Sequence, residues 1–268
     1  MKHPVVKILA ALSCALILVL PAFGQGLYWQ SKTTGTVGER TSETWAVPKK
    51  MKMVQSGKEQ TISIIRLDKE VMWQLNPPKK TYSEMTFAQM ENVARKAGGK
   101  MDAAMAKMQE QMKDMPEEQR KMVEKMMGDR VPGAGAQNSA AVQVINTGEH
   151  KTISGFSTTK YTVQQGDQTT MTLWVTKDVR GFEEMRDDWQ TFSRRMAAMA
   201  PQGRGMADAY KNIDGFPIQT EMGNLMTTTV TKVERRSTPA SEFEIPSGYA
   251  KVRGEMEDAM DKMDKEDD

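Results

Sequence analysis

Methionine is the residue whose number and spacing could support chemistry in this chain. The sequence contains 24 methionines, and many of them recur at every third or fourth position between residues 90 and 126. Thioether sulfurs are soft ligands that suit Cu(I). Compatible spacings occur at Met51-x-Met53, Met105-x-x-Met108 and Met112-x-x-Met115. Because no histidine or cysteine accompanies these pairs, a Cu(I) site is the least favoured interpretation, and we predict no metal site and no cofactor.

Two other interpretations of the methionine pattern rest on packing. Side chains three and four positions apart share one face of a helix, so the pattern predicts an amphipathic helical hairpin that uses methionine in place of leucine. Alternatively, the flexible and polarisable side chains form an adaptable surface that accepts lipid chains or exposed polypeptide. The predicted stripe consists of Met101, Met105, Met108, Met112, Met115, Met122 and Met126.

Cysteine and histidine are too scarce for most nucleophilic or metal chemistry. The only cysteine is Cys14, and the two histidines are His3 and His150. Counting therefore excludes an internal disulfide and a cysteine or histidine metal cluster. His150 lies in the turn-like segment 148–151, where we expect a solvated side chain and not the base of a catalytic triad. No pair of acidic residues has motif support, so we predict no catalytic residue and no enzyme activity.

The first 24 residues have the pattern of a cleaved signal peptide. Two lysines precede an apolar run at residues 8–20, which is too short for a membrane-spanning helix of about 20 residues. Ala22 and Gly24 suit a signal-peptidase site, so we expect a mature protein that starts near Gln25 and lies in the periplasm or outside the cell. After cleavage it would not be an integral membrane protein. The alternatives are an uncleaved anchor and lipidation at Cys14.

The charge balance argues against nucleic acid as a partner. The chain has 37 Lys and Arg residues against 35 Asp and Glu residues. Removing the two signal-peptide lysines leaves 35 against 35, so the mature protein is formally neutral. Nucleic-acid binding depends on a basic surface, and this composition does not predict one.

Most of the chain after residue 26 has the pattern of strands separated by tight turns. In residues 71–75, large apolar side chains alternate with Met72 and Gln74, which puts one apolar face on a strand. Short turns favour an antiparallel arrangement. We predict about eleven strands, at residues 27–35, 40–47, 50–53, 61–67, 71–75, 80–84, 141–146, 157–164, 169–176, 215–222 and 225–233.

Helices interrupt these strands at two places. Thr86 and Gln89 form a capping-box pattern that starts a long Met-rich insert over residues 86–128, with a second helix from Pro116 and a linker at 129–139. The other helix is predicted over residues 178–199, and its apolar stripe consists of Phe182, Met185, Trp189, Phe192 and Met196.

The C-terminal part is predicted to contain little regular structure beyond its two strands. A short helix covers residues 206–212, and residues 239–249 form an extended closing segment. Residues 253–268 are acidic, with methionines at helical spacing, which predicts a solvated amphipathic tail.

Six short motifs occur in order between Leu27 and Val252: WAVPKKMK at 45–52, RLDK at 66–69, NPPKKTY at 76–82, LWVT at 173–176, GFPI at 215–218 and FEIPSGY at 243–249. Together they resemble an uncharacterised family of bacterial exported proteins related to the outer-membrane lipoprotein carriers and receptors (the LolA/LolB-like superfamily). The motifs are moderately specific, and none of them is a catalytic signature.

The resemblance implies an α+β fold in which a strongly curved antiparallel sheet, a half-barrel, has helices over its concave side. This domain would cover residues 25–252. In the superfamily the concave side holds acyl chains or other hydrophobic ligands, which bind through burial worth about 25 cal/mol per Å². The long Met-rich insert departs from the small carriers and could instead fill the groove. Our candidate lining residues are Trp45, Met53, Trp73, Tyr82, Tyr161 and Trp174.

The sequence therefore predicts an exported carrier or binding protein for a lipid or another apolar ligand. The alternative is a non-enzymatic interaction or chaperone-like protein of the cell envelope, whose Met-rich helices contact a protein partner. Copurifying phospholipid would favour the first function, and copurifying protein would favour the second.

Overall fold

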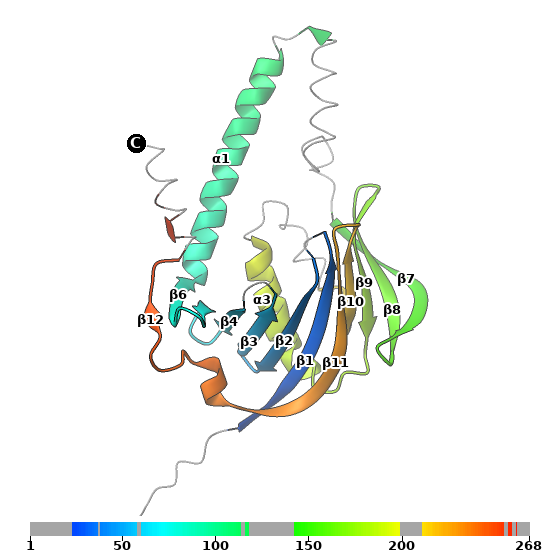
Figure 1. The fold of residues 1–268 in the computed structure, drawn as a ribbon. Coiled ribbons are helices and arrows are strands. Elements are labelled where there is room, and N and C mark those ends of the chain that lie inside the picture. The colour runs from blue at the N-terminus through cyan, green and yellow to red at the C-terminus, as the bar shows by residue number, and fades with distance from the viewer. Residues whose placement is uncertain are drawn as a thin grey trace, which may run out of the picture.

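In the computed structural model, an open sheet of twelve strands curves around a helix that lies against its concave side (Figure 1). The structure describes residues 23–36, 38–57, 60–113, 116–117, 142–198, 211–254, 257–258 and 261. The predicted α+β class, with a curved antiparallel sheet and a few helices, is confirmed. The strands are β1 (Phe23–Gly35), β2 (Arg40–Val47), β3 (Lys50–Ser56), β4 (Thr61–Arg66), β5 (Val71–Asn76), β6 (Thr81–Thr86), β7 (Val142–Ile153), β8 (Phe156–Gln165), β9 (Gln168–Thr176), β10 (Phe216–Met222), β11 (Met226–Pro239) and β12 (Ala250–Lys251).

The two halves of the sheet meet where β1 pairs with β11. The strand order is β12-β6-β5-β4-β3-β2-β1-β11-β10-β9-β8-β7. Chain neighbours pair antiparallel within each half, and the register of β1 with β11 runs from Phe23 opposite Pro239 to Gly35 opposite Met226. A pairing so distant in sequence explains why β11 continues to Pro239, beyond the predicted end of this strand at residue 233.

Two further strands differ from the sequence prediction. β12 is a two-residue strand parallel to β6 that was not predicted, and it directly follows the segment 239–249 that we predicted to be extended. β7 runs to Ile153, although we predicted an end at residue 146 and a turn at Gly148. Gly148 instead lies in a bulge between Asn146 and His150, because the pairing with β8 resumes after three unpaired residues. His150 is therefore a strand residue, exposed as predicted, and not a turn residue.

The predicted start of the long helix is confirmed in atomic detail. Helix α1 spans Phe87–Lys113. The backbone N–H of Gln89 donates to Thr86 Oγ1 at 3.1 Å, and the N–H of Thr86 donates to Gln89 Oε1 at 2.8 Å. These are the two reciprocal bonds of a capping box. Phe87 and Met90 are each 1% exposed and pack with the end of the sheet, while the rest of α1 extends beyond it (Figure 1).

The other predicted helix is shorter than expected. A 3₁₀ turn, η2 (Glu183–Met185), leads into α3 (Arg186–Ala198). Several predictions lie outside the described residues: the signal peptide up to residue 22, the helix from Pro116 with Met115, Met122 and Met126, the linker, the helix at 206–210 and most of the acidic tail. The side chains of Met101 and Met105 also lie outside the described part, whereas Met108 and Met112 are half-buried.

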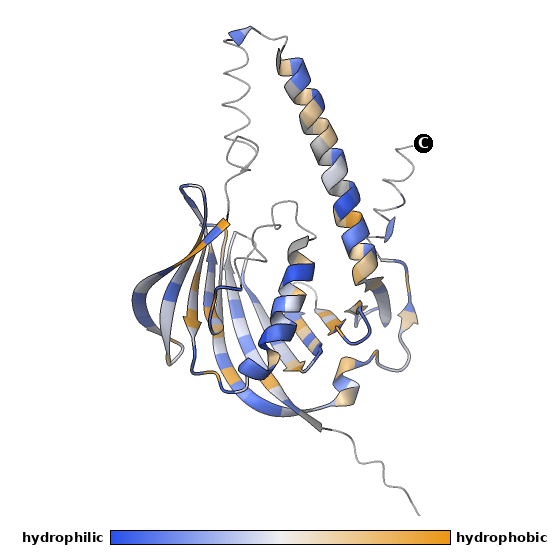
Figure 2. Cartoon of the chain, turned by 180° about the vertical axis from the view of Figure 1, so that it is seen from behind, coloured by the Kyte–Doolittle hydropathy of each residue, from blue (hydrophilic) through white to orange (hydrophobic). Residues whose placement is uncertain are grey.

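The sheet has one face toward α3 and an opposite, outer face, and each face has its own cover. On the inner face, Met51, Ile65 and Met85 lie in strands of the same half-sheet and pack with α3 and the start of α1. Figure 2 shows α3 from behind, lying in the hollow of the sheet. On the outer face, Ile64 and Trp73 pack under Phe243, which is fully buried. Phe243 belongs to residues 239–251, here called the C-terminal strap, which includes the 3₁₀ turn η3 (Ala240–Phe243) and β12.

A buried arginine fastens this strap to the sheet. The Arg66 side chain is 4% exposed and holds Asp68 through two hydrogen bonds of 2.8 and 2.7 Å. It also donates to the Phe243 carbonyl at 3.2 Å and to the carboxylate of Glu244. Farther along the strap, Lys251 pairs with Glu84 at 2.8 Å. A buried charge is tolerated only when partners of this kind surround it.

The same contacts change the acidity of three carboxyl groups. The hydrogen bond from Arg66 lowers the pKa of Asp68. Burial acts to raise the pKa of Glu244, but the hydrogen bonds from Lys69 and Arg66 outweigh it, and this pKa is also lowered. Hydrogen bonds from Lys251 and then Trp73 lower the pKa of Glu84. The charged forms of these groups therefore stabilise the folded state.

Replacing Arg66 should loosen the strap and destabilise the protein. Arg66→Met keeps most of the side-chain volume but removes all of its charge-assisted hydrogen bonds, so we expect a loss of about 2–3 kcal/mol in unfolding free energy. Chemical denaturation followed by circular dichroism measures this loss. The matched control is Arg235→Met, which removes an exposed arginine 3.6 Å from Glu184 and should cost less than about 1 kcal/mol. Equal losses in the two variants would contradict the assigned role.

The stability should also decrease in acid. Groups with lowered pKa values contribute stability that is complete above their ordinary pKa of about 4 and is lost as the pH falls through the lower folded-state value. Thermal midpoints should therefore fall between about pH 5 and pH 3, and the decrease should be smaller in Arg66→Met. Parallel curves for wild type and variant would show that Asp68 and Glu244 are not coupled to Arg66.

Candidate functional site

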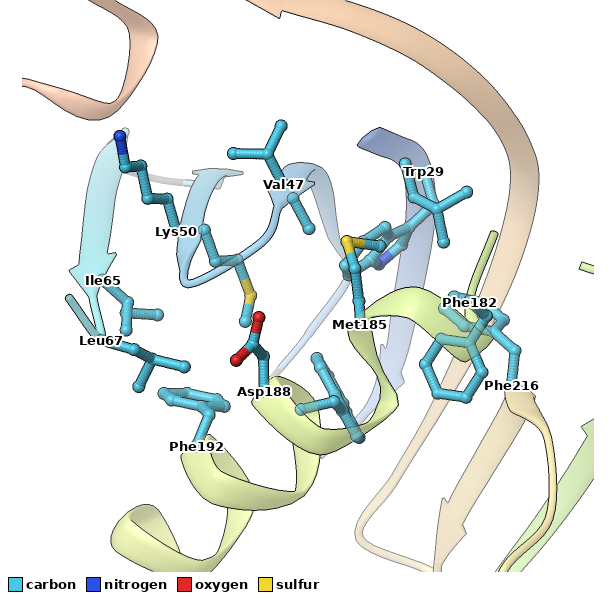
Figure 3. Close-up of a pocket in the computed structure, with 14 residues that line it drawn as sticks. Trp29, Val47, Lys50, Ile65, Leu67, Phe182, Met185, Asp188, Phe192 and Phe216 are labelled. Atoms are coloured by element: carbon cyan, nitrogen blue, oxygen red, sulfur yellow. The ribbon is translucent and has the colours of Figure 1, made fainter. Parts of the chain in front are cut away.

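A small apolar cavity lies between α3 and the inner face of the sheet (Figure 3). Its volume is about 30 Å³, which is room for about two water molecules. Aromatic and aliphatic side chains form nearly all of its wall. The lining residues are Leu27, Trp29, Ala46, Val47, Lys50, Met51, Ile65, Leu67, Phe182, Met185, Asp188, Trp189, Phe192 and Phe216.

Aromatic rings from α3 and the sheet interlock beside this cavity. Trp29 of β1 lies edge-on to Phe216 of β10 and to Trp189 of α3, with ring centroids 5.5 and 6.2 Å apart. Phe182, just before η2, meets Phe216 edge-on at 5.2 Å. Edge-to-face pairs of this kind add to the energy of burial. The stripe that the sequence predicts on this helix therefore faces the concave side of the sheet through Phe182, Met185, Trp189 and Phe192.

Polar contacts with neighbouring segments also hold α3. Near its start, the Asp188 carboxylate accepts a hydrogen bond of 2.6 Å from the backbone N–H of Lys49, in the turn between β2 and β3. Near its end, the Arg195 guanidinium pairs with Glu70 at 3.1 Å and with Glu91 of α1 at 3.6 Å. Both carboxylates on the Arg195 side are exposed, so these are contacts that water can replace at little cost.

A polar cleft of about 320 Å³ adjoins the apolar cavity. It lies between the end of β9, the segment leading to α3 and the start of β10. Its lining residues are Thr176, Lys177, Val179, Phe182, Glu183, Arg186, Asp214 and Gly215. Gly215 has a φ of +135°, and a Cβ there would lie 2.4 Å from the Thr176 carbonyl oxygen, so only glycine allows this close approach.

Charged groups of both signs line the cleft. Asp214 accepts contacts from Lys177 at 2.5 Å and from Arg186 at 3.0 Å. The hydrogen bond from Lys177 lowers the pKa of Asp214, and the same contact raises the pKa of Lys177. Within the described part of the chain, the buried Nε of Arg186 has no hydrogen-bond partner. The cleft is thus lined by a charged ion pair and by an arginine with one buried, unpartnered donor.

The six residues predicted to line a concave groove do not gather around this cavity. Trp45, Trp73 and Tyr82 lie on the outer face, in the cluster that the strap covers. Cations lie over the two tryptophan rings: Lys52 Nζ lies 5.4 Å from the Trp45 ring centroid, and Lys69 Nζ lies 5.2 Å from that of Trp73. Alternation along a strand shows which residues share a face, but not which face holds the helix.

The other three predicted lining residues lie elsewhere. Trp174 is buried beneath Lys151, whose Nζ is 3.9 Å from the ring centroid. Tyr161 belongs to a separate cluster on β8 and β9 with Leu173. Met53 is half-buried, two positions beyond Met51 on β3, and does not line the cavity.

The described residues were searched for a metal-binding cluster and for a membrane-spanning helix. No group of three His, Cys, Asp or Glu side chains in this part of the chain converges to hold a metal ion. Among the described helices, none combines the length and the apolar character that crossing a membrane requires.

A comparison with models of known protein families assigns the chain to a family. A family model described as a domain of unknown function (DUF4412) matches residues 91–249, more than half of the sequence. The chain belongs to the DUF4412 family. The match includes most of α1, the polar cleft and most of the strap, whereas β1 to β6 lie before it. A comparison with curated proteins finds no match.

Solved structures share only a distant likeness with this DUF4412 member. An uncharacterized conserved protein from Thermus thermophilus has 9% identity and a TM-score of 0.44, over 85% of this chain and 90% of that one. PNGF-II has 8% identity and a TM-score of 0.38, over 88% and 32%. The Pseudomonas aeruginosa MucA/MucB complex has 11% identity and a TM-score of 0.37, over 84% and 56%. The chain thus spans about a third of PNGF-II, and scores below 0.5 carry no functional argument.

Truncating one aromatic ring of the cavity wall should lower the free energy of unfolding. Phe216 is 3% exposed and contacts two other rings, so Phe216→Ala should destabilise the protein by about 3–5 kcal/mol. Phe156→Ala is the control, because Phe156 is only half-buried at the margin of the same cluster. Denaturation midpoints measure both losses. A larger loss for Phe156→Ala would show that the ring cluster is not the centre of this core.

Proposed function

We propose that this protein is an exported, non-enzymatic binding protein that holds a lipid or another apolar molecule between α3 and the inner face of its sheet. The observation that carries the proposal is the apolar cavity, walled by aromatic and aliphatic side chains from both sides. Concave apolar sites with few polar groups are the usual form of small-molecule sites. The motif resemblance to lipoprotein carriers and the signal-like N-terminus support the same function and a periplasmic location.

Binding requires α3 to move. A cavity of about 30 Å³ is far below the roughly 300–1,000 Å³ of typical ligand pockets. Thirteen residues of α3 span about 20 Å along the sheet, so moving this helix outward would uncover a groove of that length. The inner wall of the groove would then consist of Leu27, Trp29, Met51, Ile65 and Phe216. An acyl chain would replace the apolar side of α3 on this wall.

The contacts of α3 suit a displaceable cover. Its apolar side chains lose their burial when the helix leaves, but a ligand chain restores that burial to the sheet. Its polar contacts, through Arg186, Asp188 and Arg195, are few and partly exposed. The closed state therefore competes directly with the ligand, and the apparent affinity depends on the fraction of molecules in which α3 is displaced.

A second function, protein binding by the Met-rich insert, rests on the position of α1. Only the first turns of α1 pack with β6 and α3, and the helix then extends beyond the sheet (Figure 1). Ala103, Ala104 and Lys107 are exposed, and Met108 and Met112 are half-buried. A protruding helix with adaptable methionine side chains suits contact with another polypeptide.

Native mass spectrometry with lipid extraction tests the first function and separates it from the second. We expect the purified protein to carry a bound mass that extracts as lipid, or to take up added fatty acid. An empty protein that refuses fatty acid would contradict the carrier function. If such a protein also copurified with a polypeptide that is lost on deleting residues 100–113, the second function would replace the first.

Weakening the contact at the end of α3 should strengthen uptake. Arg195→Gln removes ion pairs worth about 0.5–1 kcal/mol to the closed state, so the apparent affinity for a fluorescent fatty acid should rise about two- to fivefold. Arg194→Gln is the matched control, because Arg194 is the neighbouring arginine and donates to Thr191 of its own helix. Equal affinities in wild type and Arg195→Gln would show that α3 is not the cover.

A further inference from the structure

The polar cleft and the apolar cavity lie on either side of one shared wall residue. Phe182 lines both of them, and Phe216 in the cavity follows Gly215 in the cleft directly along the chain. Arg186, the first residue of α3, lines the cleft as well. A ligand chain in the opened groove would therefore have its polar end beside the cleft.

The charges of the cleft balance. Lys177 and Arg186 supply two positive charges, and Glu183 and Asp214 supply two negative charges. The Lys177 and Asp214 side chains are 72% and 48% exposed, so their ion pair can exchange partners at little cost. The Arg186 guanidinium is 37% exposed and pairs with Asp214 at 3.0 Å, so it can also exchange this partner for an incoming oxygen at little cost.

We propose that this cleft binds the head group of a zwitterionic amphiphile that carries a phosphate and a primary ammonium group. The phosphate lies against Arg186 and Lys177, where planar and flexible cationic donors suit its oxygens. The ammonium lies against Asp214 and Glu183. The acyl chain occupies the groove under α3, so this inference rests on the proposed function.

The charge balance favours a zwitterion over an ion of either sign. A purely anionic head group would displace Asp214 from its two cations and leave that carboxylate unpaired beside Glu183. A quaternary ammonium has no N–H to donate to these carboxylates. A head group with both charges replaces each ion pair by another and leaves no charge without a partner, which limits the desolvation cost.

The test compares amphiphiles that share one acyl chain and differ only in the head group. The probes are a lysophosphatidylethanolamine, a lysophosphatidylglycerol and a monoacylglycerol, with free phosphoethanolamine as a chainless probe. Binding to the full chain is measured below the micelle concentration by calorimetry and by tryptophan fluorescence, since Trp29 and Trp189 line the cavity. We expect the lysophosphatidylethanolamine to bind about tenfold more tightly than the monoacylglycerol, as charge-assisted hydrogen bonds would give.

Two variants locate the head group. Asp214→Asn and Lys177→Gln should each reduce the preference for lysophosphatidylethanolamine to about threefold or less, with the monoacylglycerol affinity unchanged. Both side chains are largely exposed, so folding is preserved. Glu39→Gln is the matched control, because it removes a carboxylate from the exposed pair with Lys32 at 2.9 Å, and it should change neither affinity.

The outcomes separate the two proposals. Equal binding of all three amphiphiles, unchanged by Asp214→Asn, would overturn the head-group assignment and leave the carrier function standing. Tighter binding of the lysophosphatidylglycerol would also overturn it, in favour of an anion site. Free phosphoethanolamine binding as tightly as the lysolipid would show a site for a soluble zwitterion and not for a lipid. If no amphiphile binds, the carrier function fails together with this inference.

Discussion

A sheet that is apolar on both faces must be covered on both faces, and most of this structure follows from that constraint. Ile64 and Ile65 are consecutive residues of β4 and are 1% and 2% exposed. Consecutive strand residues point to opposite faces, so neither face can remain open to water. At β4, helix α3 and the first turns of α1 cover the inner face, and the C-terminal strap covers the outer face.

The two covers are held by different kinds of interaction. The strap is fastened by the buried Arg66 and by main-chain pairing of β12 with β6, in which the N–H of Ala250 donates to the Lys80 carbonyl at 2.9 Å. Helix α3 is held by interlocking rings and by polar contacts with exposed partners. Buried ionic contacts are costly to break one partner at a time, whereas exposed ones are weak. This difference is the physical reason for our proposal that α3 moves and that binding occurs on the inner side.

The motifs that carry the family resemblance are divided between these roles. Segments 66–69 and 243–249 meet at the Arg66 cluster and build the outer cover. Segment 215–218 instead lies where the cavity and the polar cleft join. Four of the six motifs contribute lining residues to the cavity or the cleft. They are segment 45–52 (Ala46, Val47, Lys50 and Met51), segment 66–69 (Leu67), segment 173–176 (Thr176) and segment 215–218 (Gly215 and Phe216).

The sequence by itself determined the existence of eleven of the twelve strands, most of the turns, the capping box at Thr86 and the apolar stripe that includes Phe182 and Trp189. These features depend on residues close together in the chain, through alternation, turn chemistry and helical spacing. Only the tertiary structure decided that Trp45 and Trp73 face the strap and that the α3 stripe faces the cavity. It also brought Asp214 beside Lys177 and Arg186. The reason is that a period of two leaves the identity of each face open until distant segments, such as β1 with β11, have paired.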